Sequence, residues 1–239
     1  MQSLLAGASD LGLSLTTGHI KALETYYDEL IEWNRRFNLT AITDRNGILI
    51  RHFLDSLSCL AAVPHAELSA GTRVIDVGTG AGFPGIPLKI VCPNMRLTLL
   101  EATGKKVTFL EHAVEVLGLQ GVTVIKGRAE ELGRAPEHRE QYDWAIARAV
   151  AEMPVLAEYL LPLVAVGGGV LAAKGEMAVA EIHRAEAAIK TLGGHVRRLI
   201  PVELRGLTET RYLVVIDKIA ATPDKYPRRP GMPTKRPLT

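Results

Sequence analysis

Apolar residues recur at steps of three and four between residues 17 and 34, the spacing that places them on one face of a helix. They are Ile20, Leu23, Tyr27, Leu30 and Ile31. A threonine at position 16 or 17 would cap the start of this helix. A second stripe begins after Asp44 and runs through Ile48, Phe53, Leu57 and Leu60. The pattern predicts a helical extension over residues 1–63, followed by a linker at 64–71.

From residue 72 onward, short β-rich runs alternate with longer helical segments, an order typical of βαβ units and a parallel sheet. Strands are expected over residues 73–77, 97–101, 122–126, 143–147 and 169–174. Helices are expected between them, near residues 83–91, 105–117, 153–166 and 176–192. Two further strand candidates, at 195–204 and 211–219, are joined by a short loop that contains glycine, so they predict an antiparallel hairpin.

This order of elements predicts a seven-stranded, mostly parallel sheet with a terminal antiparallel hairpin. By analogy, it is the α/β architecture of class I methyltransferases, which are Rossmann-like relatives of the dinucleotide-binding fold. The predicted parts of the chain are a helical extension at 1–63, a methyltransferase-like domain at 72–219 and a C-terminal arm at 220–239.

Composition and cysteine usage narrow the class of protein. The chain has 239 residues, of which 47% are hydrophobic and 23% are charged, a balance that excludes a disordered or fibrous protein. No apolar run approaches the roughly 20 residues of a membrane span, and residues 1–15 lack the basic start of a secretory signal. We therefore expect a cytoplasmic protein. Cys59 and Cys92 form neither a disulfide framework nor a zinc-binding pattern, so we expect no metal.

Three glycines, Gly78, Gly80 and Gly82, follow the first predicted strand and lead into a helix. Glycine permits positive φ angles and a close approach of ligand to backbone, so this turn is a candidate binding site. Phe83 stands where a dinucleotide fingerprint needs its third glycine, which disfavours NAD. Asp76 precedes the turn and could face the cationic ammonium of a methyl donor, S-adenosylmethionine. Bracing of the loop is the alternative role for this carboxylate.

Acidic residues also follow the next two predicted strands. Glu101 ends the second strand, where a carboxylate can accept hydrogen bonds from both hydroxyls of a ribose. Ala129 and Glu130 follow the third strand, in a position suited to the edge of an adenine, although an ordinary solvated glutamate is nearly as good an explanation. Both NAD and S-adenosylmethionine contain adenosine, so these residues alone do not separate the two.

The residues after the fourth predicted strand limit the chemistry. Residues 147–150 contain neither the cysteine needed to methylate a carbon of cytosine nor a Pro-Pro-aromatic loop for an adenine amine. Guanine N7 remains, because its free lone pair needs no proton removed first, so no general base is expected. Arg148 is the candidate residue to orient the donor or the guanine, and a surface ion pair with Glu152 is the alternative.

Basic residues in two regions are candidates for RNA contacts. Near the predicted site, these are Arg35 and Arg36, in a segment that mixes basic, amide and aromatic side chains, and Arg211. The C-terminus is more basic, because residues 218–239 contain six lysines and arginines and one aspartate, whereas the whole chain has a net charge of +2. The candidates in it are Arg228, Arg229, Lys235 and Arg236.

A basic, proline-rich C-terminus of this kind is typical of an extended arm that neutralises RNA phosphates. A disordered tail without a partner is the alternative. If the arm binds RNA, removal of residues 222–239 should weaken RNA binding and leave donor affinity unchanged.

The sequence closely resembles the glucose-inhibited division protein B family, the family of ribosomal RNA small subunit methyltransferase G, over nearly its whole length. The resemblance rests on the segments WNRRFNLTAITD, RHFLDSL, DVGTGAGFPGIPLKI, LLEATGKKVTFL, GRAEEL, ARAVA, AAKG and RYLVVIDK and on the YPRRPG arm. It implies methylation of guanine N7 in small-subunit (16S) ribosomal RNA by S-adenosylmethionine, with that RNA or the small ribosomal subunit as partner and a monomeric enzyme. The donor contacts that it implies are Gly78, Phe83, Ala129, Glu130 and Arg148, with Glu101, Ala102 and Thr103 at the ribose and adenine.

Three alternatives stay open from the residues themselves. A NAD-dependent oxidoreductase is disfavoured by Phe83 and Asp76. A methyltransferase of another RNA, a small molecule or a protein would keep the same donor site, and only the basic arm argues against it. A ribosome-binding module without donor affinity is disfavoured by the intact glycines and Glu101.

Overall fold

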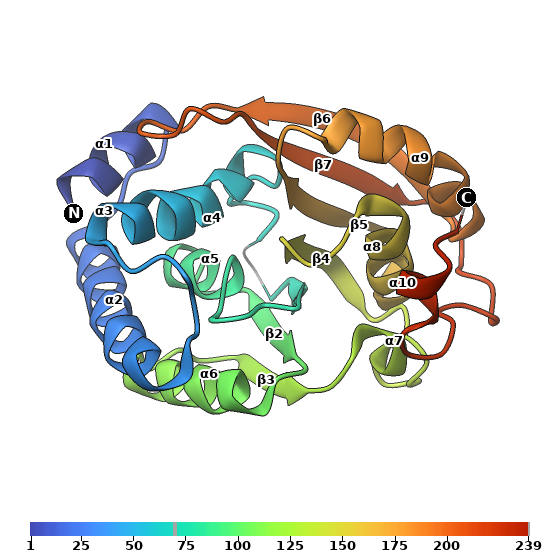
Figure 1. Cartoon of the computed structure of the whole chain (residues 1–239), viewed down its shortest axis with the longest axis horizontal. Coiled ribbons are helices and arrows are strands. Elements are labelled where there is room, and N and C mark those ends of the chain that lie inside the picture. The colour runs from blue at the N-terminus through green and yellow to red at the C-terminus, as the bar shows by residue number, and fades with distance from the viewer. Residues whose placement is uncertain (69–70, 239) are drawn as a thin grey trace.

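A seven-stranded sheet forms the centre of the computed structural model, which describes residues 1–68 and 71–238 (Figure 1). The strand order is β3-β2-β1-β4-β5-β7-β6. The strands are β1 (Arg73–Val77), β2 (Arg96–Glu101), β3 (Val122–Lys126), β4 (Tyr142–Arg148), β5 (Val164–Lys174), β6 (Gly194–Val202) and β7 (Arg211–Lys218). β7 runs antiparallel to β5 and β6, whereas the other pairs are parallel. The predicted α/β class and the terminal hairpin are confirmed.

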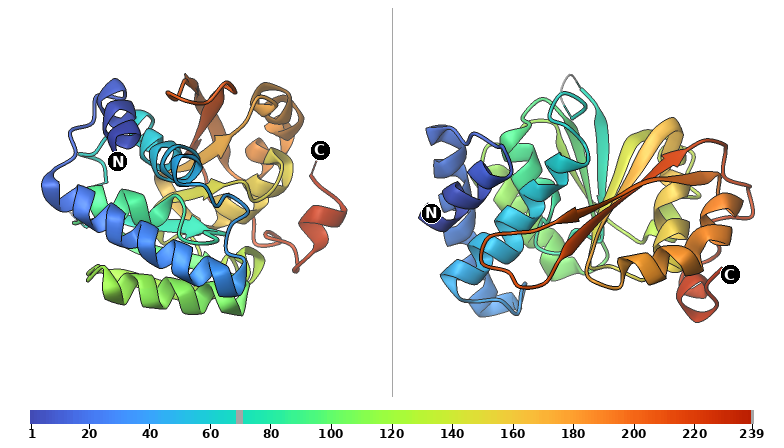
Figure 2. Two further views of the ribbon diagram at one scale, coloured as in Figure 1. Left: turned by 60° about the vertical axis from the view of Figure 1, so that its left-hand side comes forward. Right: turned by 90° about the horizontal axis from the view of Figure 1, so that it is seen from above.

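Helices cover both faces of this sheet (Figure 2). One face carries α1 (Gln2–Asp10), α2 (Thr17–Phe37), α3 (Arg45–Gly47), the π-helical segment η1 (Ile48–Leu54), α4 (Asp55–Leu57), η2 (Ser58–Ala61), α5 (Gly85–Val91) and α6 (Gly104–Val116). The other face carries α7 (Ala129–Leu132), α8 (Met153–Leu160), η3 (Leu161–Leu163) and α9 (Ala178–Thr191). The last helix, α10 (Met232–Lys235), packs on α8.

The start of α2 follows from its local sequence. Thr16 Oγ1 accepts a hydrogen bond from His19 N at 3.2 Å, and His19 Nδ1 accepts one from Thr16 N at 3.3 Å. This reciprocal pair satisfies backbone donors that the first turn of a helix leaves free. Asn38 ends the helix in the left-handed conformation, at φ 49°. The predicted cap is confirmed, and the helix continues beyond residue 34 to Phe37.

The N-terminal helices share a hydrophobic core with the sheet. The ring of Tyr26 lies 5.5 Å from that of Phe53 and 5.4 Å from that of Phe83, between centroids. Because Phe83 belongs to the turn after β1, residues 1–63 pack directly against that turn. The division of the chain into parts 1–63, 72–219 and 220–239 stays a prediction.

Two predicted boundaries, the end of the fourth helix and the start of the fifth strand, are wrong. The helix expected to reach residue 166 ends at Leu160, and β5 begins at Val164 instead of residue 169. Pro162 has no N–H to donate, so it favours the end of the helix at this point. The helix α1 lies within the predicted helical extension, whereas α7 and α10 were not predicted, because helices of four residues are too short for a clear periodic pattern. In the described part of the chain, no helix is long and apolar enough to cross a membrane.

Candidate active site

The glycine turn follows β1, which lies between β2 and β4 in the sheet. Gly78, Gly80 and Gly82 have φ angles of 68°, 65° and 97°, a region that glycine adopts without strain. The N–H groups of Gly78 and Thr79 donate hydrogen bonds to Leu100 O at 2.8 and 3.2 Å. These bonds fasten the turn to β2, so its backbone lies at the carboxyl edge of the sheet.

The three glycines have different surroundings. A Cβ atom at Gly78 would lie 2.8 Å from Val150 Cγ2, and one at Gly82 would lie 2.5 Å from Ile86 Cδ1, so both positions need glycine for packing. At Gly80, the nearest atom to such a Cβ is Lys106 Nζ, at 4.0 Å. The backbone of Gly80 is therefore open to a ligand, which is what a donor lying against the turn requires.

Asp76 lies beneath this turn and is fully buried. Its Oδ2 accepts hydrogen bonds from Thr79 Oγ1 at 2.6 Å and Gly85 N at 2.8 Å. Among the described residues, Oδ1 has no hydrogen-bond partner. The carboxylate thus braces the glycine turn and the start of α5, the role that the sequence left as the alternative. Its predicted contact with the donor ammonium stays a prediction.

The burial of Asp76 leads to a pH-dependent stability. Burial raises the pKa of this carboxyl from 3.8 to about 6, so the folded protein binds more protons than the unfolded chain between these values. The contribution of Asp76 to the free energy of unfolding is therefore fully present below pH 3.8, the pKa of this carboxyl in the unfolded chain. It is lost as the pH rises through about 6, the pKa in the folded protein. We expect the free energy of unfolding, wild type minus Asp76→Asn, to fall by about 2–3 kcal/mol between about pH 4 and 7.

Chemical denaturation across this pH range measures the difference. Asp44→Asn is the matched control, because Asp44 caps α3 on the surface and asparagine caps a helix equally well. A difference in the free energy of unfolding between wild type and Asp76→Asn that stays constant from about pH 4 to 7 would contradict the raised pKa of Asp76.

Glu101 connects the glycine turn with the loop after β2. Its Oε2 accepts a hydrogen bond from Gly80 N at 3.0 Å, and its Oε1 accepts one from Thr103 N at 2.8 Å. The side chain is buried, whereas Ala102 and Thr103 are exposed at the same edge of the sheet. A carboxylate has further lone pairs, so Glu101 keeps acceptor capacity for the predicted ribose contact.

The two residues predicted at the adenine lie in α7. Gly127 N donates to Glu101 O at 3.1 Å, which sets the start of α7 beside Glu101. Ala129 and Glu130 are buried. Glu130 Oε1 accepts a hydrogen bond from Gly231 N at 2.9 Å. This contact with the C-terminal segment was not predicted from the sequence.

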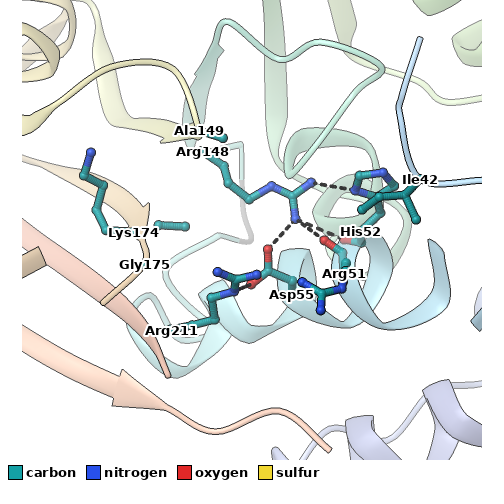
Figure 3. A pocket seen from close by; sticks show the side chains of 10 residues that line it. Ile42, Arg51, His52, Asp55, Arg148, Ala149, Lys174, Gly175 and Arg211 are labelled. Atoms are coloured by element: carbon teal, nitrogen blue, oxygen red, sulfur yellow. Dashed lines mark hydrogen bonds and ion pairs between the residues drawn. The ribbon is translucent and has the colours of Figure 1, made fainter. Parts of the chain in front are cut away.

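Arg148, at the end of β4, points toward the N-terminal helices (Figure 3). Its NH1 donates hydrogen bonds to Asp55 Oδ2 at 2.6 Å and to Arg51 O at 3.0 Å. The side chains of Arg148 and Asp55 are only 13% and 7% exposed. Glu152, the alternative partner, pairs instead with Arg184 at 3.2 Å, so that alternative is wrong.

A pocket of about 310 Å³ opens beside Arg148, at the ends of β4 and β5 (Figure 3). Its volume is at the lower end of the roughly 300–1,000 Å³ found for small-molecule sites. The lining residues are Ile42, Arg51, His52, Asp55, Arg148, Ala149, Ala173, Lys174, Gly175 and Arg211. The N-terminal helices and the sheet therefore build this pocket together.

His52 gives the pocket a neutral aromatic wall. Burial and the neighbouring Arg148 lower the pKa of its imidazole to about 4, so the ring is uncharged at pH 7. The imidazole stacks on the ring of Phe83, with centroids 4.6 Å apart and an interplanar angle of 16°. Phe83 therefore links the glycine turn with the pocket.

Arginines supply the positive charge at the pocket. Arg211 Nε lies 3.6 Å from Asp55 Oδ1, and Arg51 NH2 lies 3.4 Å from Glu209 Oε1. Their side chains are partly exposed, at 26% and 39%. Lys174 points away from the other labelled side chains (Figure 3). Among the predicted RNA contacts, Arg211 is thus the one that lies at this pocket.

The other predicted RNA contacts are dispersed. Arg35 and Arg36 each pair with Glu32 at 3.2 Å on the exposed face of α2. Arg229, Lys235 and Arg236 are exposed in the C-terminal segment.

The sequence predicts an extended C-terminal arm, and this prediction is wrong, because the segment is docked on the domain. Arg228 NH2 lies 2.6 Å from Oε2 of Glu158, a carboxylate in α8 that is completely buried. A buried carboxylate needs a cationic or hydrogen-bonding partner, which fixes the tail to the domain. Within residues 1–68 and 71–238, no group of three or more His, Cys, Asp and Glu side chains is placed to hold a metal ion.

Comparisons with known proteins show which family the chain belongs to. A family model for GidB, described as rRNA small subunit methyltransferase G, matches residues 19–205. A protein named ribosomal RNA small subunit methyltransferase G from Pelotomaculum thermopropionicum is 51% identical over 237 residues, which cover 99% of this chain and 98% of that protein. A protein of the same name from Roseiflexus castenholzii is 52% identical over 241 residues, covering 100% of both chains.

Solved structures show the same fold at low sequence identity. A SAM-dependent methyltransferase from Aquifex aeolicus superposes with a TM-score of 0.55 and 17% identity, covering 75% of this chain and 96% of that one. The fold of the chain is therefore that of the class I S-adenosylmethionine-dependent methyltransferases. With the family match over most of its length, the chain belongs to the GidB family of ribosomal RNA small subunit methyltransferase G.

Proposed function

We propose that this protein transfers the methyl group of S-adenosylmethionine to N7 of a guanine in 16S ribosomal RNA. The observation that carries the proposal is the adjacency of two sites at the carboxyl edge of the sheet. The open backbone of Gly80 beside Glu101 suits a donor, and the pocket at Arg148 suits a base. The full-length relatives are named for methylation of ribosomal RNA of the small subunit.

Three strand ends would hold the donor. The glycine turn follows β1, Glu101 ends β2, and α7 follows β3, in the order β1-β2-β3 across the sheet. A ligand with a nucleoside and an amino-acid end can lie along this edge, with its ribose at Glu101 and its adenine at Ala129 and Glu130. S-adenosylmethionine supplies an electrophilic methyl group there.

The pocket residues would position the guanine. Guanine N7 reacts through a lone pair, so the protein has no proton to remove, and the work left to it is orientation and exclusion of water. Arg148 NH1 is already bonded to Asp55 and to a backbone carbonyl of η1. This arrangement holds the guanidinium as a wall of the pocket, where it does not compete for the lone pair of N7.

The arginines at the pocket would contact the RNA around the target base. We expect Arg211→Ala to weaken RNA binding about threefold to tenfold and to reduce the salt dependence of the affinity by about one phosphate contact. Binding of a 16S RNA fragment at several salt concentrations measures both effects. The control is Arg205→Ala, because Arg205 pairs with Asp10 at 2.8 Å on the exposed loop before β7. Equal effects of the two substitutions would contradict a role for the pocket.

Methyl transfer tests the proposed function. Incubation with tritiated S-adenosylmethionine and either protein-free 16S RNA or small ribosomal subunits should place label in the RNA. The better of the two substrates identifies the form of the partner, and gel filtration of the active protein tests our expectation of a monomer. Donor binding without label in either RNA would contradict the proposal.

A further inference from the structure

The C-terminal residues 226–234, here called the clasp, lie against the segment that carries Ala129 and Glu130. Arg134, just after α7, donates from Nε to Pro227 O at 2.7 Å. Arg139, in the same loop, donates from NH1 to Tyr226 O at 2.8 Å. The ring of Tyr226 is buried. Side chains of the α7 region thus hold the backbone of the clasp at its beginning.

An ion pair with α8 fixes the middle of the clasp. Arg228 makes four hydrogen bonds to Glu158, one from its backbone N and three from its guanidinium, at 2.6 to 3.1 Å. Glu158 is 0% exposed and Arg228 is the charged partner at its carboxylate. Detachment of the clasp would remove the cation at this carboxylate together with four hydrogen bonds, so the docked state is favoured.

The clasp also touches α7 itself. Gly231 N donates to Glu130 Oε1 at 2.9 Å. At the other end of α7, Pro227 packs so closely on Gly133 that a Cβ there would lie 2.9 Å from Pro227 Cγ. A four-residue helix cannot be stable by itself. The position of α7 therefore depends on these contacts and on its link to Glu101.

We propose that the clasp is a positioning element of the donor site, which fixes α7 so that Ala129 and Glu130 meet the adenine end of S-adenosylmethionine. The inference rests on the proposed function, because the role of α7 at the adenine comes with it. It also replaces the expectation that removal of residues 222–239 leaves donor affinity unchanged. Loss of the clasp should raise the Kd for the donor about tenfold.

Two variants test the clasp. The first ends at Lys225 and lacks residues 226–239. The second, Gly133→Val, crowds Pro227 at the end of α7 without removing any charged group, and it decides the question if the truncated protein does not fold. A protein that lacks only residues 237–239 is the control, because it keeps every clasp contact described above. Calorimetry measures the Kd for S-adenosylhomocysteine, thermal unfolding checks the fold, and steady-state assays measure KM for the donor and kcat.

The expected result is a Kd raised about tenfold in both variants, with KM for the donor raised equally, kcat at saturating donor within twofold of wild type and the control unchanged. An unchanged donor Kd in folded variants would overturn the clasp, and weaker RNA binding in the truncated protein would then favour the arm as an RNA contact. A wild-type protein that binds no S-adenosylhomocysteine would overturn the proposed function and the clasp together. If the wild-type protein and both folded variants bind S-adenosylhomocysteine equally well, the role proposed for the clasp is wrong and the proposed function still stands.

Discussion

The substitution Gly80→Val should abolish measurable donor binding, raising the Kd for S-adenosylmethionine by at least about 100-fold. A side chain at this position would point into the open space beside the turn, where the nearest atom to its Cβ is 4.0 Å away. The branched side chain of valine would fill the volume in which the donor must approach the backbone. Calorimetry with S-adenosylhomocysteine measures the effect, which we expect to be the largest of any single substitution at the turn.

A control must separate this steric effect from backbone strain, because Gly80 has a φ angle of 65°. Gly118→Val is suited to this purpose. Gly118 has a φ angle of 60°, and a Cβ there would have no neighbour within 4 Å. It follows α6, at the edge of the sheet opposite the glycine turn. Comparable loss of donor binding in both variants would mean that strain, and not occlusion, explains the result.

Replacement of Arg148 by alanine should affect both stability and methyl transfer. It leaves the buried carboxylate of Asp55 without its closest cation, and breaking a buried pair in this way costs about 3 kcal/mol or more. The pocket wall also loses its anchor to η1, and misplacement of a bound base by about 1 Å can cost about 100-fold in rate. We therefore expect methyl transfer to fall by about two orders of magnitude.

Urea unfolding and single-turnover methyl transfer measure these two effects. Arg184→Ala is the control, because its pair with Glu152 is 50–68% exposed and should contribute less than about 1 kcal/mol. Arg148→Lys keeps the charge but loses the forked geometry, so an intermediate result is expected. Wild-type stability and rate in Arg148→Ala would contradict the role assigned to this residue.

Local features of the fold and the site could be predicted from the sequence. Residues 73–77 form β1 as predicted, because a short β-rich run between turn residues is a signal contained within the strand itself. The glycine turn was equally visible, since three glycines at fixed spacing after a strand have few other uses. Glu101 could be placed because it ends the next strand of a parallel sheet, and the ends of parallel strands meet at one edge.

Contacts between distant segments could not be predicted in this way. Asp55 and Arg148 are 93 residues apart, and Glu130 and Gly231 are 101 apart, so no local period relates them. The C-terminal segment has the basic, proline-rich composition of a free arm, and only tertiary packing shows that Arg228 is bound to a buried carboxylate. One signal was available: Glu158 is an isolated acidic residue within the apolar run of α8, and such a residue needs a partner.

The most direct test of guanine N7 methylation is the chemical identity of the product. RNA methylated by the purified protein with labelled S-adenosylmethionine would be digested to nucleosides, and the labelled species separated by chromatography against methylguanosine standards. We expect the label in 7-methylguanosine, because the reaction at N7 requires no general base. The pocket offers groups that can position a guanine, and its histidine, His52, is uncharged at pH 7. Label in a carbon-methylated base or at an exocyclic amine would contradict the account.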